Sequence, residues 1–88
     1  MHVAVRGRVQ GVGFRWFVRE RARALGLSGW VRNVPDGSVE VFAVGPMGEL
    51  ARLRRLLGEG PPAARVEHVV DEVGDPGAAA LTPFGVLR

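Results

Sequence analysis

The distribution of hydrophobic residues predicts a chain of short strands and two longer helices. Val3, Val5 and Val9 fall on one side of an extended segment, which is the pattern of a strand with one buried face. Later segments rich in valine and aromatic residues predict further strands. Together the predicted strands cover residues 2–9, 27–34, 38–45, 64–73 and, as a short edge strand, 84–88. In the fourth of them, Val66 and Val69 are out of phase for strict alternation, which predicts a β-bulge.

Two longer segments carry hydrophobic residues at the three- and four-residue spacing of helices that bury one side. The first covers residues 14–25, and its predicted buried stripe consists of Phe14, Val18, Ala22 and Leu25. Gly26 follows, and glycine suits the left-handed conformation that ends many helices. The second begins at Pro46, a residue type favoured at helix starts, and its apolar stripe consists of Leu50, Leu53 and Leu57. The glycine- and proline-rich residues 58–62 end it.

The order of these elements predicts the fold. Residues 34–37 read Val-Pro-Asp-Gly, which is typical of a tight turn, so the second and third strands form a hairpin. The order is therefore strand, helix, strand, strand, helix, strand. With right-handed crossovers it predicts an α+β fold, a ferredoxin-like βαββαβ plait with two helices on one face of an antiparallel sheet. The expected strand order is 4-1-3-2, and residues 1–88 are expected to form a single domain.

The loop between the first strand and the first helix has the features of a phosphate-binding site. Gly11 and Gly13 can adopt positive φ and let a ligand come close to the backbone. Because a helix begins near Phe14, unpaired N–H groups and a partial positive charge face this loop. Arg15 adds a planar guanidinium suited to bidentate contact with phosphate. Spacing alone leaves open the alternative that this is an ordinary glycine-containing turn.

Asn33 lies near the end of the second predicted strand. In the plait, the first and second strands run parallel with the third between them, so their carboxyl ends lie about 9–10 Å apart at one edge. A neutral amide is therefore expected to face the anion site across a gap that fits a phosphate and a water molecule. Without the phosphate loop, an ordinary turn residue would be the favoured interpretation of Asn33.

The composition excludes several other kinds of site. The chain has no lysine, which excludes a nucleotide-triphosphate loop, and the glycine loop lacks the third glycine of a dinucleotide fingerprint. It has no cysteine, and its two histidines lie far apart, so we expect neither thiolate chemistry nor a metal. We find no signal-peptide pattern and no membrane-length apolar run, which predicts a cytoplasmic protein without a membrane partner. The net charge of +3 favours anionic partners but is too small to indicate nucleic-acid binding.

The remaining conspicuous residues are best explained by structural roles. All twelve basic residues are arginine, a skew that codon bias in a GC-rich genome explains, so their number says little about function. The chain has a single asparagine and a single glutamine, and both lie beside the turns described above. We expect a solvated row at Arg19 and Arg23, packing or partial exposure at Trp16, core packing at Trp30, a turn role at Asp36, a brace for the loop at Gln10, and surface or edge positions at His2 and His68.

Two segments closely resemble the signatures of the acylphosphatase family. Residues 7–15 read Gly-Arg-Val-Gln-Gly-Val-Gly-Phe-Arg, and residues 29–40 read Gly-Trp-Val-Arg-Asn-Val-Pro-Asp-Gly-Ser-Val-Glu. The resemblance extends loosely through residues 64–66, whereas residues 77–86 depart most from the usual ending. It implies hydrolysis of the carboxyl-phosphate bond of small acyl phosphates by a monomer, without metal, cofactor or covalent intermediate. By the same resemblance, Arg15 binds the phosphate and Asn33 orients the attacking water. The phosphoryl oxygens, or a product-like phosphate or sulfate, contact backbone N–H groups of Gln10, Gly11, Val12, Gly13 and Phe14.

The chemistry of these residues is consistent with that activity. Phosphoryl transfer through a loose transition state requires mainly positioning and charge stabilisation, and a carboxylate leaves without general-acid help. Two alternatives stay open. RNA-recognition modules share this plait, but the third strand, residues 39–44, holds one aromatic and one acidic residue, which disfavours nucleic acid as a partner. The other alternative is a non-catalytic or carbamoyl-phosphate-handling domain that resembles the acylphosphatase-like part of larger maturation enzymes, although the short length and starting methionine favour a stand-alone protein.

Overall fold

The computed structural model describes residues 1–88, which form five strands and two helices. In chain order these elements are β1 (His2–Arg8), α1 (Phe14–Ala24), β2 (Ser28–Asn33), β3 (Val39–Val44), α2 (Met47–Glu59), β4 (Arg65–Asp71) and β5 (Gly85–Val86). Each predicted element is present, and its ends differ from the prediction by at most two residues. Neither helix is long and apolar enough to cross a lipid bilayer.

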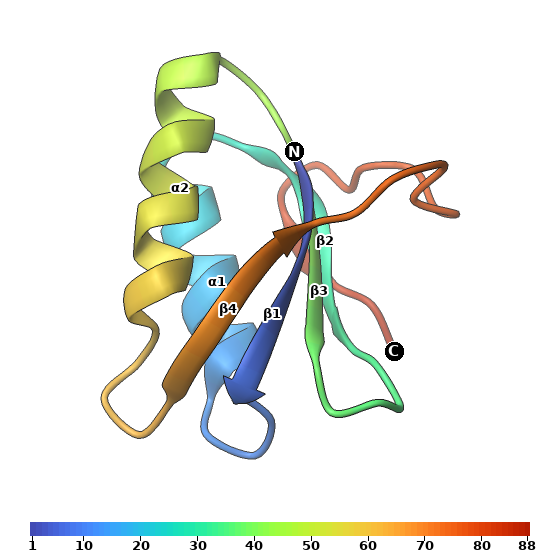
Figure 1. Ribbon diagram of the computed structural model, residues 1–88. Coiled ribbons are helices and arrows are strands. Elements are labelled where there is room, and N and C mark those ends of the chain that lie inside the picture. The colour runs from blue at the N-terminus through green and yellow to red at the C-terminus, as the bar shows by residue number, and fades with distance from the viewer.

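The strands form one sheet in the order β4-β1-β3-β2-β5, and both helices cover the same face of it (Figure 1). The predicted order of the first four strands and the ferredoxin-like α+β fold are confirmed. β1 is antiparallel to β3 and β4, and β2 is antiparallel to β3, but β5 pairs with β2 in parallel. The sheet is therefore mostly rather than wholly antiparallel, because the chain after β4 crosses the outer face of the sheet and reaches the free edge of β2.

The hydrophobic core lies between the sheet and the helices. The predicted helix stripes supply much of it, and the buried helix residues are Phe14, Phe17, Val18, Ala22, Leu53 and Leu57. Leu25, the last predicted member of the first stripe, is only partly buried because α1 ends at Ala24 and the chain turns at Gly26, where φ is 71°. Burial of these stripes fixes how each helix is rotated about its own axis.

The predicted bulge lies where β1 meets β4. Arg6 pairs with His68 and Gly7 pairs with Val66, which leaves Glu67 as the extra residue. At Gly7 φ is 130°, and a Cβ there would lie 2.2 Å from a backbone carbonyl oxygen of β4. Only glycine fits this close approach between the two strands. His68 is exposed, as predicted.

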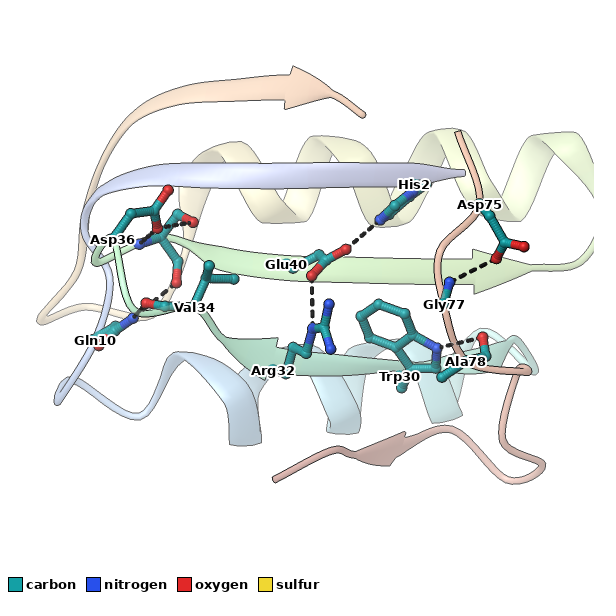
Figure 2. Close-up of polar contacts among 11 residues, drawn as sticks. His2, Gln10, Trp30, Arg32, Val34, Asp36, Glu40, Asp75, Gly77 and Ala78 are labelled. Atoms are coloured by element: carbon teal, nitrogen blue, oxygen red, sulfur yellow. Dashed lines mark hydrogen bonds and ion pairs between the residues drawn. The ribbon is translucent and has the colours of Figure 1, made fainter. Parts of the chain in front are cut away.

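On the outer face of the sheet, one prediction is confirmed and one is wrong. Trp30 is fully buried, as predicted, but it lies on the face opposite the helices, apart from the main core cluster, where its Nε1 donates a 3.1 Å hydrogen bond to the Ala78 carbonyl oxygen (Figure 2). His2 is not a surface residue: its side chain is 13% exposed, and its Nε2 lies 2.5 Å from Glu40 Oε2. The segment that contains Ala78 covers Trp30, and His2 in turn packs edge-on against the rings of Trp30 and Phe42. Because the ring of Trp30 is buried, it cannot stack on a nucleic-acid base, which weakens the RNA-binding alternative.

Candidate active site

The loop between β1 and α1 has the geometry of an anion site. Gly11 and Gly13 adopt left-handed φ values of 73° and 78°, and a Cβ at either position would meet no atom within 4 Å. Glycine is therefore needed here for its conformation rather than for lack of space. The N–H groups of residues 10–13 donate no hydrogen bond within the protein, and no side chain caps α1. These donors and the positive end of the helix dipole are therefore free for an anion.

The side chain of Gln10 ties this loop to the turn between β2 and β3. Its Nε2 donates hydrogen bonds of 2.8 Å to the Val34 carbonyl oxygen and 2.9 Å to the Ser38 carbonyl oxygen (Figure 2). Figure 1 shows the loop and the turn at the same end of the molecule. This is the bracing contact that the sequence predicted for Gln10, and it holds the loop beside the end of β2.

Asp36 shapes the turn itself, as predicted. Its Oδ1 accepts hydrogen bonds from the Ser38 hydroxyl at 2.6 Å and from the Ser38 backbone N–H at 2.9 Å. The bond from the hydroxyl has the larger effect and the bond from the N–H the next, and both hold the pKa of the Asp36 carboxyl below its ordinary value. The nearby charge of Arg6 lowers this pKa further. The carboxylate is thus committed to the turn and does not border the site.

Arg15 and Asn33 border one cavity of about 440 Å³, together with Gly11 and Gly13 of the loop. Asn33 is the last residue of β2, so the parallel course of β1 and β2 puts it at the end of the sheet where the loop lies. Arg15 and Asn33 also border an adjoining cavity of about 400 Å³ beside the β2–β3 turn. The fold therefore brings together the two side chains that the sequence singled out from separate segments.

The larger cavity is strongly cationic. Arginines line it at Arg15, Arg19, Arg23 and Arg88, and no acidic residue or histidine does. Arg15 takes part in none of the ion pairs and side-chain hydrogen bonds of the protein, so its guanidinium is available to a ligand. No three His, Cys, Asp or Glu side chains are grouped closely enough to hold a metal ion. The cavity can therefore bind and orient an anion, but it offers no side-chain general base.

Comparison with known proteins places this site in a family. The family model for acylphosphatase matches residues 1–79, which include the phosphate loop, Arg15 and Asn33. The chain belongs to the acylphosphatase family. Members of this enzyme family hydrolyse acyl phosphates. An acylphosphatase of Koribacter versatilis is 57% identical over 72 residues, which are 82% of this chain and 66% of that protein, just under two thirds of its length.

Solved acylphosphatase structures share the whole fold. The acylphosphatase of Bacillus subtilis is 36% identical with a TM-score of 0.81, and the match covers 99% of this chain and 96% of that one. HypF of T. kodakarensis matches with 29% identity and a TM-score of 0.81, covering 99% of this chain but 11% of that much longer protein. The acylphosphatase fold is thus found both alone and within a larger chain.

Sequence reasoning missed several residues that border the acylphosphatase cavity. Arg23 is exposed and Arg19 is partly exposed, which agrees with the expected solvated row. Both also line the cavity, and Arg23 Nε donates a 2.7 Å hydrogen bond to the Phe84 carbonyl oxygen. Their four-residue spacing from Arg15 was the available signal, since such residues share a helix face. Trp16 is 63% exposed, consistent with partial exposure, and it also borders the cavity. Gly85 and Val86 reach the cavity through the pairing of β5 with β2, which no local pattern indicates.

Proposed function

We propose that this chain hydrolyses the carboxyl-phosphate bond of small acyl phosphates, releasing a carboxylate and inorganic phosphate. One observation carries the proposal: unpaired backbone N–H groups, the unpaired guanidinium of Arg15 and the amide of Asn33 converge on one cavity with no acidic lining. The family of the chain and the chemistry of these groups agree on the same reaction.

In the proposed reaction, the phosphoryl group lies in the β1–α1 loop. Backbone N–H groups of Gln10, Gly11, Val12, Gly13 and Phe14 contact its oxygens, and Arg15 neutralises the charge that spreads over them in the transition state. Such donors stabilise the transition state effectively because they are already oriented before the reaction begins. The same contacts would hold inorganic phosphate or sulfate as a product-like anion.

Asn33 orients the attacking water in this proposal. Its amide oxygen accepts a hydrogen bond from the water and directs the oxygen toward phosphorus, opposite the departing carboxylate. The water's proton passes to a phosphoryl oxygen of the substrate, so the reaction requires no histidine or carboxylate base in the cavity. The leaving carboxylate is stable without protonation, whereas the alkoxide of a phosphate monoester is not. The site should therefore act on acyl phosphates and not on simple phosphate monoesters.

Hydrolysis of benzoyl phosphate in the presence of a chelator tests the proposal. We expect steady turnover of benzoyl phosphate, competitive inhibition by inorganic phosphate, and no turnover of a phosphate monoester such as phenyl phosphate. Activity that persists in the chelator would agree with phosphate binding by Arg15 and the backbone. Lack of benzoyl phosphate hydrolysis, or faster hydrolysis of phenyl phosphate, would overturn the proposal.

A second candidate is a domain that handles carbamoyl phosphate, which the resemblance to part of larger maturation enzymes implies. The match to part of T. kodakarensis HypF is consistent with this fold belonging to a longer chain. Carbamoyl phosphate is itself an acyl phosphate, so the two candidates differ in selectivity rather than in reaction. A preference for carbamoyl phosphate over benzoyl phosphate in kcat/KM would favour this candidate.

A further inference from the structure

Arg23, near the end of α1, holds the C-terminal segment of the chain. Its Nε donates a 2.7 Å hydrogen bond to the carbonyl oxygen of Phe84, which accepts no hydrogen bond from the backbone. The two residues are 61 positions apart in the sequence. No other side-chain hydrogen bond joins α1 to residues 81–88. This single contact therefore ties the first helix to the chain that forms the last strand.

The segment that begins at Phe84 forms part of the cavity wall. Three of its residues line the cavity, and these are Gly85, Val86 and Arg88. β5 consists of two residues and pairs only with β2, at one edge of the sheet. Just beyond β5, the Leu87 N–H donates a 3.0 Å hydrogen bond to the Val31 carbonyl oxygen. A terminal strand this short has few hydrogen bonds of its own, so its order depends on further contacts such as the one at Phe84.

The hydrogen bond and the charge of Arg23 are separable properties. Arg23 follows Arg15 by eight residues, which is about 12 Å along the helix axis at 1.5 Å per residue, so it lies far from the phosphate loop. Its guanidinium has no acidic partner, and its one hydrogen-bond acceptor is a neutral carbonyl oxygen. The observed contact of Arg23 is therefore with the cavity wall and not with another charge.

We infer that Arg23 is a positioning residue for the reaction: through Phe84 it holds β5 in place, so that Val86 and Arg88 confine the acyl portion of the substrate. This inference rests on the proposed function and deepens it. If the wall is in place in only a fraction of the molecules, the apparent affinity for the substrate falls in proportion to that fraction. Phosphate binding in the loop and the chemical step use other groups, and they should not depend on Arg23.

Two substitutions of Arg23 separate its hydrogen bond from its charge. The amide nitrogen of glutamine is as many bonds from Cα as the Nε of arginine, so Arg23→Gln keeps a donor for Phe84 and removes the charge. Methionine has a similar length and no donor, so Arg23→Met removes both. Arg52→Met is the matched control, because Arg52 is exposed on α2, lies outside the cavity and takes part in no ion pair.

In Arg23→Met we expect the KM for benzoyl phosphate to rise roughly fivefold, the size of effect that one net hydrogen bond has on an equilibrium. The kcat and the inhibition constant of inorganic phosphate should stay close to the wild-type values. Arg23→Gln and Arg52→Met should keep the wild-type KM. In amide hydrogen exchange, the Leu87 N–H should exchange roughly fivefold faster in Arg23→Met alone, because the segment opens more often. Circular dichroism checks that each variant is folded.

Equal increases of KM in Arg23→Gln and Arg23→Met would overturn the inference, because they would assign the effect to the charge. An unchanged exchange rate of Leu87 in Arg23→Met would also overturn it, and so would phosphate inhibition weakened as much as substrate binding. In each of these cases, hydrolysis of benzoyl phosphate by the wild-type protein would leave the proposed function intact. If the wild-type protein hydrolysed no benzoyl phosphate, the proposed function would fail and this inference with it.

Discussion

Replacing Gln10 by alanine tests how the two halves of the site are held together. The change removes the donor of two hydrogen bonds, 2.8 Å and 2.9 Å long, between the phosphate loop and the β2–β3 turn. Each bond contributes about 1 kcal/mol, so Gln10→Ala should lower the free energy of unfolding by about 2 kcal/mol. For a domain of this size that corresponds to a Tm lower by roughly 8–16 °C.

Gln10→Glu sharpens this prediction because it keeps the shape of the side chain and removes the donor. At neutral pH the introduced carboxylate faces the carbonyl oxygens of Val34 and Ser38, so the variant should be at least as unstable as Gln10→Ala. Protonation restores one donor, and the neutral form is favoured in the folded protein, which raises the pKa of the introduced carboxyl. Its stabilising contribution is therefore present below the unfolded pKa of about 4.3 and is lost as pH rises through the folded value.

Thermal and urea unfolding followed by circular dichroism between pH 4 and pH 7 measures these effects, and benzoyl phosphate turnover measures the consequence for activity. Displacement of the loop should lower kcat/KM by about tenfold or more, because small misplacements of binding groups are costly in catalysis. A Gln10→Ala protein with wild-type stability would refute the bracing role. If such a protein also lost activity, Gln10 would instead contact the substrate.

Four further outcomes are expected. Arg15→Ala should reduce kcat/KM by roughly 10³-fold, like the loss of other transition-state arginines, and a loss under tenfold would contradict its role. Asn33→Ala should lower kcat while inorganic phosphate still competes, and unchanged kcat with lost phosphate inhibition would reverse the assignment. Burial raises the pKa of Glu40, but hydrogen bonds from His2 and Arg32 outweigh burial and leave the pKa below the ordinary 4.5. The stability that this carboxylate contributes is thus present above pH 4.5 and is lost as pH falls through the lower folded pKa. When the free energy of unfolding is measured at decreasing pH below 4.5, Glu40→Gln should therefore lose less of it than the wild type. Gly7→Ala should lower the free energy of unfolding by about 2 kcal/mol or more, because its Cβ would meet the β4 backbone. Gly58→Ala, where the added Cβ lies in open space on α2, should raise it by about 0.5–1 kcal/mol. Urea unfolding measures both changes.

The outer face of the sheet shows where prediction from local pattern fails. Trp30 and Val31 are neighbours in a strand rich in apolar residues, and the sequence does not say which of them faces the helices. Pairing of β2 with β3 puts Val31 in the core and Trp30 on the other side, where the segment that contains Ala78 covers it. The partial burial of His2 follows from its contacts with the rings of Trp30 and Phe42 and with Glu40, which lie far from it in the chain.

The sequence by itself determined the elements, the turns and the phosphate loop of this protein, because these depend on residues close together in the chain. Periodic burial defines the helices, and left-handed φ at Gly11 and Gly13 requires glycine whatever surrounds them. The four-residue spacing put Arg19 and Arg23 on the helix face of Arg15, but only the tertiary structure decided that this face and β5 border the same cavity. β5 pairs with a strand more than fifty residues earlier in the chain. Such a long-range pairing leaves no periodic trace in a single sequence.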